Sequence, residues 1–477
     1  MKHTIGISIL LLLCGCSSLP KLSENARYHQ IAANTNGNFL SLFPYQDLHW
    51  QCGLNNHLNE LVTRMQNHPI DPVTGKRKIL ISIHGGLNSI AANVKRVEEH
   101  YDSALKDGYF PVFISWRSGA ATTLYDRYFG VRNGVDRSKW ITIPSAPFYF
   151  VSDLLSGVAA IPESIWDQGA NFYNSHKNNL TGFYEKDINH RLNEFQSPDV
   201  YYTQRGAEKS SVEQIGYGIR QIIPGAVRLV STPLIEGMAD KAWGVMRRRA
   251  KTLVYRQQDL TYRGIGQSFG DLETMSDDLS ETIECENNGQ FYESGKPNGV
   301  VAQLFRSLRD VTDSEITLVG HSMGAIIAND IVNIYPDLPF SRIIHMASAD
   351  SIRNFMEKTQ PYLVKNSDTQ FFNLMLHPLN EEQEQSAFGT APEGSLLIWI
   401  DYLLENPETT LDRVAGRWEN MKWVVPLLSS EKNIHLKLFG LRQEMAYEEA
   451  PNYMFLEPIK HGDFGDFKFW KSEFYWK

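Results

Sequence analysis

The stretch SEITLVGHSMGAIIANDIV, residues 314–332, decides the fold. Its apolar run at 316–319 predicts a buried strand, which breaks at the glycine-containing G-H-S-M-G of residues 320–324. Small and apolar residues then continue at helical spacing. The order strand, sharp turn, helix would project the Ser322 hydroxyl from the end of a sheet at a helix N-terminus, where developing negative charge is stabilised. The alternative is an ordinary glycine turn beside a surface serine.

The rest of the chain supplies further strands and helices in alternation. Short apolar runs predict strands at 78–83, 111–116, 342–346, 371–376 and 434–439. Apolar positions at helical spacing predict helices at 54–67, 89–106 and 298–311, and a helical excursion at 397–424. Because helices alternate with strands, we expect an α/β fold with a mainly parallel sheet flanked by helices.

The alternation stops between residues 117 and 297. Two apolar segments in this region, 146–166 and 215–250, are broken by Gly and Pro, so neither is suited to span a membrane. We expect a large, mostly helical insertion that forms a cap or lid over the active site. Contact of this cap with the membrane surface is a further hypothesis. The alternative to a cap is a helical subdomain that only packs on the sheet.

The N-terminus has the proportions of an export signal. Lys2 precedes an apolar core at 5–13, and Leu13-Cys14-Gly15-Cys16 follows. This sequence resembles a bacterial lipobox, although a cysteine at position 14 is unusual. The resemblance implies cleavage after residue 15 and lipid attachment to Cys16, and Ser17 then implies the outer membrane, on its periplasmic side. An ordinary secretory signal is the alternative.

These segments give an expected domain organisation. We expect a signal peptide at 1–15, a tether at 16–45, the α/β domain in two parts at 46–116 and 298–477, and the insertion at 117–297. The first part and the insertion meet after the strand at 111–116, where the alternation ends.

Composition and cysteine content restrict the function. The 477-residue chain has a net charge of −9, which gives no reason to expect nucleic-acid binding. After removal of the signal, Cys52 and Cys285 remain, and in an exported protein such a pair indicates a disulfide, with two separate buried thiols as the alternative. No metal-binding spacing and no dinucleotide-binding glycine motif is present, so we expect neither metal nor cofactor.

A second glycine signal lies upstream. The apolar run KILISI at 78–83 ends in His84-Gly85-Gly86. With the G-x-S-x-G turn, this pattern resembles the α/β-hydrolase superfamily, the serine hydrolases of the esterase and lipase kind. The resemblance covers residues 78–116 and 298–464. It implies that backbone N–H groups around Gly85, Gly86 and Met323 form an oxyanion hole. A plain strand-to-helix turn is the other interpretation of H-G-G, and His84 is expected to be structural.

A serine nucleophile needs a base and an acid that orients the base. In this superfamily the chain order is nucleophile, acid, histidine. His461 follows the last predicted strand in a glycine-containing loop and is the expected base, with His377 as the alternative. Asp350 and Glu381, each after a predicted strand, are the leading candidates for the acid. Glu382 is a further one.

The resemblance implies a serine hydrolase that cleaves a carboxylic ester through an acyl-enzyme. The partners expected are an ester or lipid-like substrate and a membrane, reached through the lipid at Cys16. Two alternatives stay open: an inactive hydrolase-fold scaffold or binding lipoprotein of the envelope, and an amidase or peptidase with the same triad. The substrate and the oligomeric state do not follow from the sequence.

Overall fold

The computed structural model describes residues 22–41, 49–132, 135–137, 139–159, 183–194, 199–202, 222–256, 291–293, 296–384, 394–428, 430–439 and 458–471. The chain divides into two compact units. The first comprises residues 1–146, 244–318 and 330–340, and the second comprises 147–243, 319–329 and 341–477. This division differs from the expected two-part domain with a separate insertion, because the first unit takes both ends of the expected insertion and the second unit takes its middle, residues 147–243.

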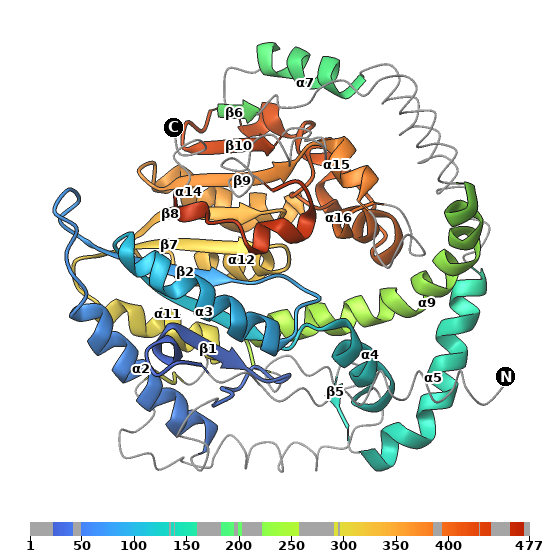
Figure 1. Ribbon diagram of the computed structural model, residues 1–477, viewed down its shortest axis with the longest axis horizontal. Coiled ribbons are helices and arrows are strands. Elements are labelled where there is room, and N and C mark those ends of the chain that lie inside the picture. Colours follow the sequence, from blue (N-terminus) through green and yellow to red (C-terminus); the bar gives the residue numbers. More distant parts are fainter. Residues whose placement is uncertain are drawn as a thin grey trace. The chain divides into compact units, whose positions relative to one another are not determined.

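The strands form a mainly parallel sheet with the order β1-β3-β2-β7-β8-β9-β10-β6 (Figure 1). In the first unit Ile81 of β2 is the partner of Val112 of β3. In the second unit Ile344 of β8 pairs with Phe372 of β9. These pairings are parallel, and each strand expected from the sequence is present. The predicted α/β fold class, a mainly parallel sheet with flanking helices, is confirmed.

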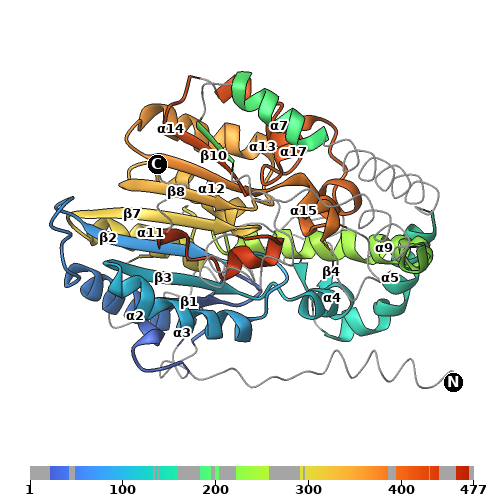
Figure 2. The same ribbon diagram turned by 45° about the horizontal axis from the view of Figure 1, so that its top comes forward.

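In the first unit, helices cover strands that are almost wholly buried. All eight residues of β3 are buried, as the continuous apolar run predicted. Helix α3 begins where Ser89 accepts a hydrogen bond from the Ala92 N–H at 3.1 Å, and it packs on β1 and β3 (Figure 2). The elements are η1 (Ala26–His29), β1 (Gln30–Ala33), α2 (Trp50–Gln66), β2 (Arg77–Ile83), α3 (Ile90–Lys106), β3 (Tyr109–Trp116), α4 (Ala120–Phe129), β4 (Val131–Arg132), β5 (Val135–Asp136), α11 (Val300–Ser307) and η3 (Leu308–Asp310).

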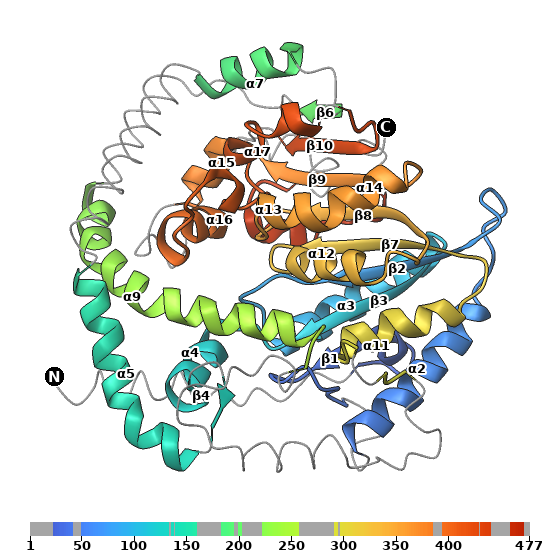
Figure 3. The ribbon, with the colours of Figure 1, turned by 180° about the vertical axis from the view of Figure 1, so that it is seen from behind.

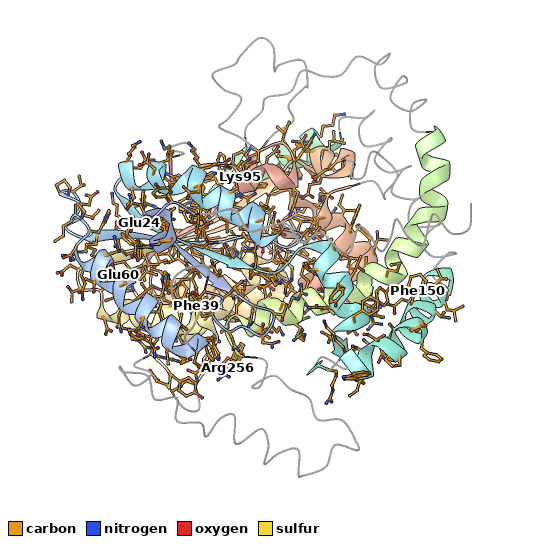
Figure 4. The ribbon with its side chains drawn as sticks, turned by 60° about the horizontal axis from the view of Figure 1, so that its bottom comes forward. Glu24, Phe39, Glu60, Lys95, Phe150 and Arg256 are labelled. Carbon is orange, nitrogen blue, oxygen red and sulfur yellow. The ribbon has the colours of Figure 1, made fainter. Side chains whose placement is uncertain are left out.

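The expected tether at 16–45 includes folded structure, which corrects the sequence interpretation. Residues 30–33 form the edge strand β1, whose four residues are all buried and pair in parallel with β3. The ring of Phe39 stacks on that of His57 from α2, with 5.4 Å between centroids (Figure 4). Sequence patterns miss β1 because four residues are too few for a period to be visible.

The second unit contains the other half of the sheet and many short helices. Its elements are α7 (Phe183–Glu194), β6 (Asp199–Tyr202), α13 (Ile352–Asn354), η4 (Phe355–Thr359), α14 (Gln360–Lys365), β9 (Gln370–Leu376), α15 (Pro378–Gln383), α16 (Leu396–Trp399), η6 (Ile400–Leu404), η7 (Thr410–Asp412), α17 (Trp418–Met421), η8 (Val425–Leu428), β10 (Ile434–Phe439), η9 (His461–Gly465) and η10 (Phe469–Lys471). The short helices at 396–421 agree with the expected helical excursion. Helices α13 and α14 lie on the face seen in Figure 3.

Five elements contain residues of both units. They are α5 (Lys139–Ala159), α9 (Ile222–Thr252), β7 (Ser314–His321), α12 (Gly324–Ile334) and β8 (Phe340–Met346). Helices α5 and α9 belong to the insertion, which is helical there as expected. The insertion also supplies β6, which pairs in parallel with β10, so it is not wholly outside the sheet. Within the described ranges, no helix is both long and apolar enough to cross a membrane.

Candidate active site

The strand–turn–helix predicted around Ser322 is present, and β7 ends one residue before this serine. Ser322 has φ +52°, a left-handed conformation that costs a side-chain-bearing residue roughly 1–2 kcal/mol. A Cβ at Gly320 would lie 2.6 Å from the Ala325 backbone nitrogen, so only glycine fits there. The turn therefore combines a strained serine with a glycine that close backbone packing requires, and such strain is common at functional sites.

The exit of β8 holds this turn in place. The Ser322 N–H donates to the Met346 carbonyl at 2.8 Å, and the Ser322 carbonyl accepts from the Ala349 N–H at 3.1 Å. Ala347 itself has φ +44°. Gly416 packs so closely on this segment that a Cβ there would lie 2.2 Å from the Ser348 nitrogen. Backbone hydrogen bonds thus join the strained Ser322 to Met346 and Ala349, which lie on either side of the strained Ala347.

The reactive atoms of the turn have no hydrogen-bond partners. The Ser322 side chain is 1 % exposed, and its Oγ is buried and forms no hydrogen bond within the structure. No hydrogen bond of the described residues uses the Met323 N–H, which lies at the start of α12. A buried hydroxyl without a partner is unusual, and it stands beside a free backbone donor.

His461 lies in the second unit with Ser322, in the short helix η9. Its ring centroid is 5.3 Å from that of His321, the residue before the nucleophile candidate. The His321 Nε2 donates to the His461 carbonyl at 3.3 Å. The contact brings the loop of the predicted base to the predicted elbow, although the two residues are 140 positions apart in sequence.

The imidazole of His461 is buried and neutral. It is 7 % exposed, and burial lowers its pKa from 6.5 to about 4. Its Nδ1 is buried without a hydrogen-bond partner. A neutral imidazole can accept a proton at pH 7, but the cation that results would need a nearby carboxylate to stabilise it.

The structure gives Asp350 partners other than a histidine. Its carboxylate accepts hydrogen bonds from the Asn329 side chain at 2.6 Å, the Asn354 side chain at 2.8 Å and the Ser351 N–H at 2.9 Å. These groups tie the exit of β8 to α12 and to α13. The contacts give the carboxylate a structural role in this loop, and its catalytic role stays a prediction.

Glu381 forms a buried ion pair. Its side chain is 2 % exposed and accepts from Arg417 Nε at 3.1 Å, while Arg417 Nη1 also binds Asp401 at 2.7 Å. Burial raises the pKa of Glu381 to about 8, against the opposing effect of Arg417. Glu382 accepts a hydrogen bond from the Tyr184 hydroxyl. Neither of these interactions involves the predicted base.

Glu384 is a carboxylate that the sequence analysis did not consider. It follows α15, and its Oε2 accepts the His461 backbone N–H at 2.9 Å. Burial raises its pKa, and the hydrogen bond from His461 opposes this effect. The run N-E-E-Q-E after β9 was the available signal, but the pattern cannot rank the glutamates within one loop.

The remaining histidines after the turn have structural surroundings. His377 is buried and accepts the Leu379 N–H at 3.1 Å on its Nδ1, which caps α15. His345 packs edge-on against Phe371 within the sheet, and burial lowers its pKa to about 3. His435 lies on β10, and its Nε2 is 2.7 Å from the side-chain oxygen of Gln370. These settings agree with the preference for His461 as the base.

In the first unit, His84 fixes the shape of the H-G-G loop. Its Nδ1 donates to the Gly85 carbonyl at 2.6 Å, and its Nε2 accepts the Trp116 N–H at 3.1 Å. The ring also stacks on Trp116, and burial lowers the pKa of His84 to about 3. The Asn88 side chain donates to the Gly86 carbonyl at 3.1 Å. His84 is thus the structural side chain that the sequence analysis expected.

Two expectations concern residues beyond this site. Cys52 on α2 is disulfide-bonded, whereas Cys285 lies outside the described residues, so their pairing stays a prediction. Cys16 also lies outside them. In the part of the chain that the structure describes, no group of three or more His, Cys, Asp or Glu residues is placed to hold a metal ion.

Comparison with known proteins adds nothing to this geometry, because the chain matches no protein-family model, no curated protein and no solved structure.

Proposed function

We propose that this chain is a lipid-anchored serine hydrolase that cleaves carboxylic esters with Ser322 as nucleophile and His461 as base. One observation carries the proposal. Ser322 stands in a strained turn between a strand and a helix with a buried, unpartnered Oγ, and the loop of a buried neutral histidine contacts the same turn. An ordinary glycine turn has no need of a side-chain-bearing residue at positive φ.

The reaction follows from these groups. Ser322 Oγ attacks the ester carbonyl carbon while its proton passes to His461 Nε2. The protonated imidazole then gives this proton to the departing alkoxide, which leaves the acyl group on Ser322. Water attacks the acyl-enzyme with His461 again as base, so the acid is released and the serine regains its proton.

Developing charge on the carbonyl oxygen needs hydrogen-bond donors. The free Met323 N–H is one such donor, at the N-terminus of α12. Gly85 and Gly86 are proposed as further donors from the sequence pattern. Removal of one oxyanion donor typically costs about 10²–10³ in kcat.

Fluorophosphonate labelling tests the nucleophile and the base. We expect the mature chain to be labelled, Ser322→Ala to lose labelling, and His461→Ala to be labelled at least about 10³-fold more slowly, since the hydroxyl then lacks its base. Ser307→Ala and His435→Ala are matched controls outside the proposed site, and they should be labelled like the wild type.

The same experiment separates the alternative function. Ser322 is almost fully buried and makes no hydrogen bond to His461, which also suits an inactive scaffold. A folded wild-type chain that stays unlabelled with and without detergent would favour the scaffold. Labelling that survives in Ser322→Ala would exclude Ser322 as the nucleophile.

Lipid anchoring at Cys16 is proposed from the lipobox alone, together with the outer membrane facing the periplasm as the location. We expect metabolic labelling with palmitate and recovery in the membrane fraction, both lost in Cys16→Ser. Recovery of this variant in the membrane fraction to the same extent would contradict the anchor.

The insertion is proposed as a cap for an apolar substrate. The part of α5 whose side chains are described has several large apolar residues at the surface, among them Trp140 at 90 % and Phe148 at 77 % exposure. Exposed apolar surface of this kind commonly covers or binds something apolar. We expect detergent to change the rate of fluorophosphonate labelling, and this response to shrink in Phe148→Ser. An unchanged response would argue against the cap.

A further inference from the structure

The proposed site needs a carboxylate beside His461, and the structure points to one. Glu384 Oε2 accepts the His461 backbone N–H at 2.9 Å. The Nδ1 atom of the His461 ring is buried and has no hydrogen-bond partner. The carboxylate of Glu384 therefore contacts the backbone of His461, the residue whose ring Nδ1 a triad acid would bind.

The other candidate acids have different partners. Asp350 binds two asparagine side chains and a backbone N–H, and Glu381 binds Arg417. Glu382 accepts from Tyr184. Glu384, in contrast, accepts the backbone N–H of His461 itself.

The backbone of His461 is held from two sides. Glu384 accepts its N–H, and His321 donates to its carbonyl. One contact comes from the chain just after α15, and the other from the end of β7. The loop is therefore fixed both to the candidate acid and to the residue beside Ser322.

We propose that Glu384 is the positioning residue of the site: it orients His461 and stabilises the imidazolium that forms when Ser322 loses its proton. This inference rests on the proposed hydrolase function. As the proton reaches His461 Nε2, the Nδ1–H becomes a charge-assisted donor to the Glu384 carboxylate. Without such a partner, the buried cation would be strongly destabilised.

Other charged or titratable groups surround this pair. His321 of β7 faces the His461 ring, and Lys460 and Asp463 lie on the His461 loop and act on the pKa of Glu384. The charge of Glu384 in turn raises the pKa of Glu381 of α15. Asp463 Oδ2 is held by the backbone N–H groups of Ile459 and Lys460, at 3.0 and 2.9 Å. The test must therefore distinguish Glu384 from these neighbours.

Hydrolysis of a p-nitrophenyl ester by Glu384→Gln tests the proposal in the mature chain. We expect kcat/KM to fall by about 10²–10⁴-fold, as the loss of a triad carboxylate does, with partial rescue in Glu384→Asp. Asp368→Asn, which removes an exposed carboxylate outside the site, is the control and should retain wild-type kcat/KM, whereas Asp350→Asn reports on the competing candidate acid.

The pH profile separates positioning from a merely structural role. A carboxylate beside His461 favours its cation and raises its pKa, so the acidic limb of kcat/KM should move to lower pH in Glu384→Gln. Lower activity with an unmoved limb would overturn the proposal, as would wild-type kinetics in Glu384→Gln with a large loss in Asp350→Asn. If the wild type is neither labelled by fluorophosphonate nor active, the proposed function itself fails.

Discussion

Gly320 and Ser322 shape the turn between β7 and α12 through opposite requirements. Ser322 adopts a left-handed conformation that glycine favours, although it has a side chain. Gly320 must lack a side chain, because the backbone of Ala325 occupies the space that a Cβ would take. The turn can contain a strained serine because hydrogen bonds to Met346 and Ala349 compensate for the strain.

Gly320→Ala should destabilise the protein and abolish labelling. The new Cβ would lie 2.6 Å from backbone that cannot move alone, so we expect a loss of roughly 1–3 kcal/mol in the free energy of unfolding. Urea denaturation measures it. Gly244→Ala on α9 is the control, because nothing lies within 4 Å of its Cβ position, and alanine favours the helix by up to about 1 kcal/mol. Equal stability of both variants would contradict the steric argument.

Between elements, a buried charge cluster joins three short helices. Arg417 precedes α17 and binds Glu381 of α15 and Asp401 of η6. Asp401 also accepts from the Asn420 side chain at 2.7 Å. A cluster of this kind needs all its members, since a lone buried charge is costly.

Arg417→Met should therefore destabilise the protein by about 3–5 kcal/mol, because the buried Asp401 loses its cation and the buried Glu381 loses its hydrogen-bond donor. Arg309→Met removes an arginine from an exposed pair with Asp337 and should cost less than about 1 kcal/mol. Urea titrations of both variants give the comparison. A small effect for Arg417→Met would mean that the cluster relaxes or that water enters it.

Sequence patterns could predict those elements whose apolar residues form long runs or clear periods. This class comprises the strands β2, β3, β7, β8, β9 and β10 and the helices α2, α3 and α11. The edge strands β1 and β6 have four residues each and were missed, because pairing with a longer neighbour decides them.

The same limit applies to the candidate site. The motif around Ser322 and the late loop of His461 were accessible from the sequence, because both follow predicted strands. Glu384 was not, since Glu381, Glu382 and Glu384 lie within four residues of one another and only their three-dimensional partners tell them apart.

For the whole molecule, buried histidines set the response to acid. Burial lowers the pKa of five of them from 6.5 to between about 3 and about 4: His57, His84, His345, His377 and His461. Below pH 6.5 the unfolded chain binds protons that the folded chain does not. The free energy of unfolding therefore decreases as the pH is lowered, by at most about 1.4 kcal/mol per pH unit for each histidine.

Glu381 acts in the opposite direction. Its pKa is raised from 4.5 to about 8, so the folded chain holds a proton that the unfolded chain releases, and this contribution is lost as pH rises through that range. Burial also raises the pKa of Glu384, so two carboxyls oppose five histidines. We therefore expect the free energy of unfolding, from urea titrations, to fall between pH 6.5 and 4.5.

His345→Leu checks the assignment to histidine. This ring lies in the sheet against Phe371, and leucine removes its titration while keeping an apolar side chain. The slope of stability against pH should become shallower by about one proton. Stability that is constant or rises on acidification of the wild type would contradict the prediction.

The folded segment before β1 would limit how far the proposed enzyme can reach from a lipid anchor. Leu22 already packs against Ala26, Val97 and Phe113 in the first unit. If lipid is attached at Cys16, six residue steps separate the anchor from that core, a fully extended span of about 20 Å. A flexible tether from residue 16 to residue 45 would have allowed a separation of about 100 Å between the anchor and the folded domain. The catalytic body would thus work beside the bilayer surface, and the substrates within its range are those that the membrane itself holds or brings near.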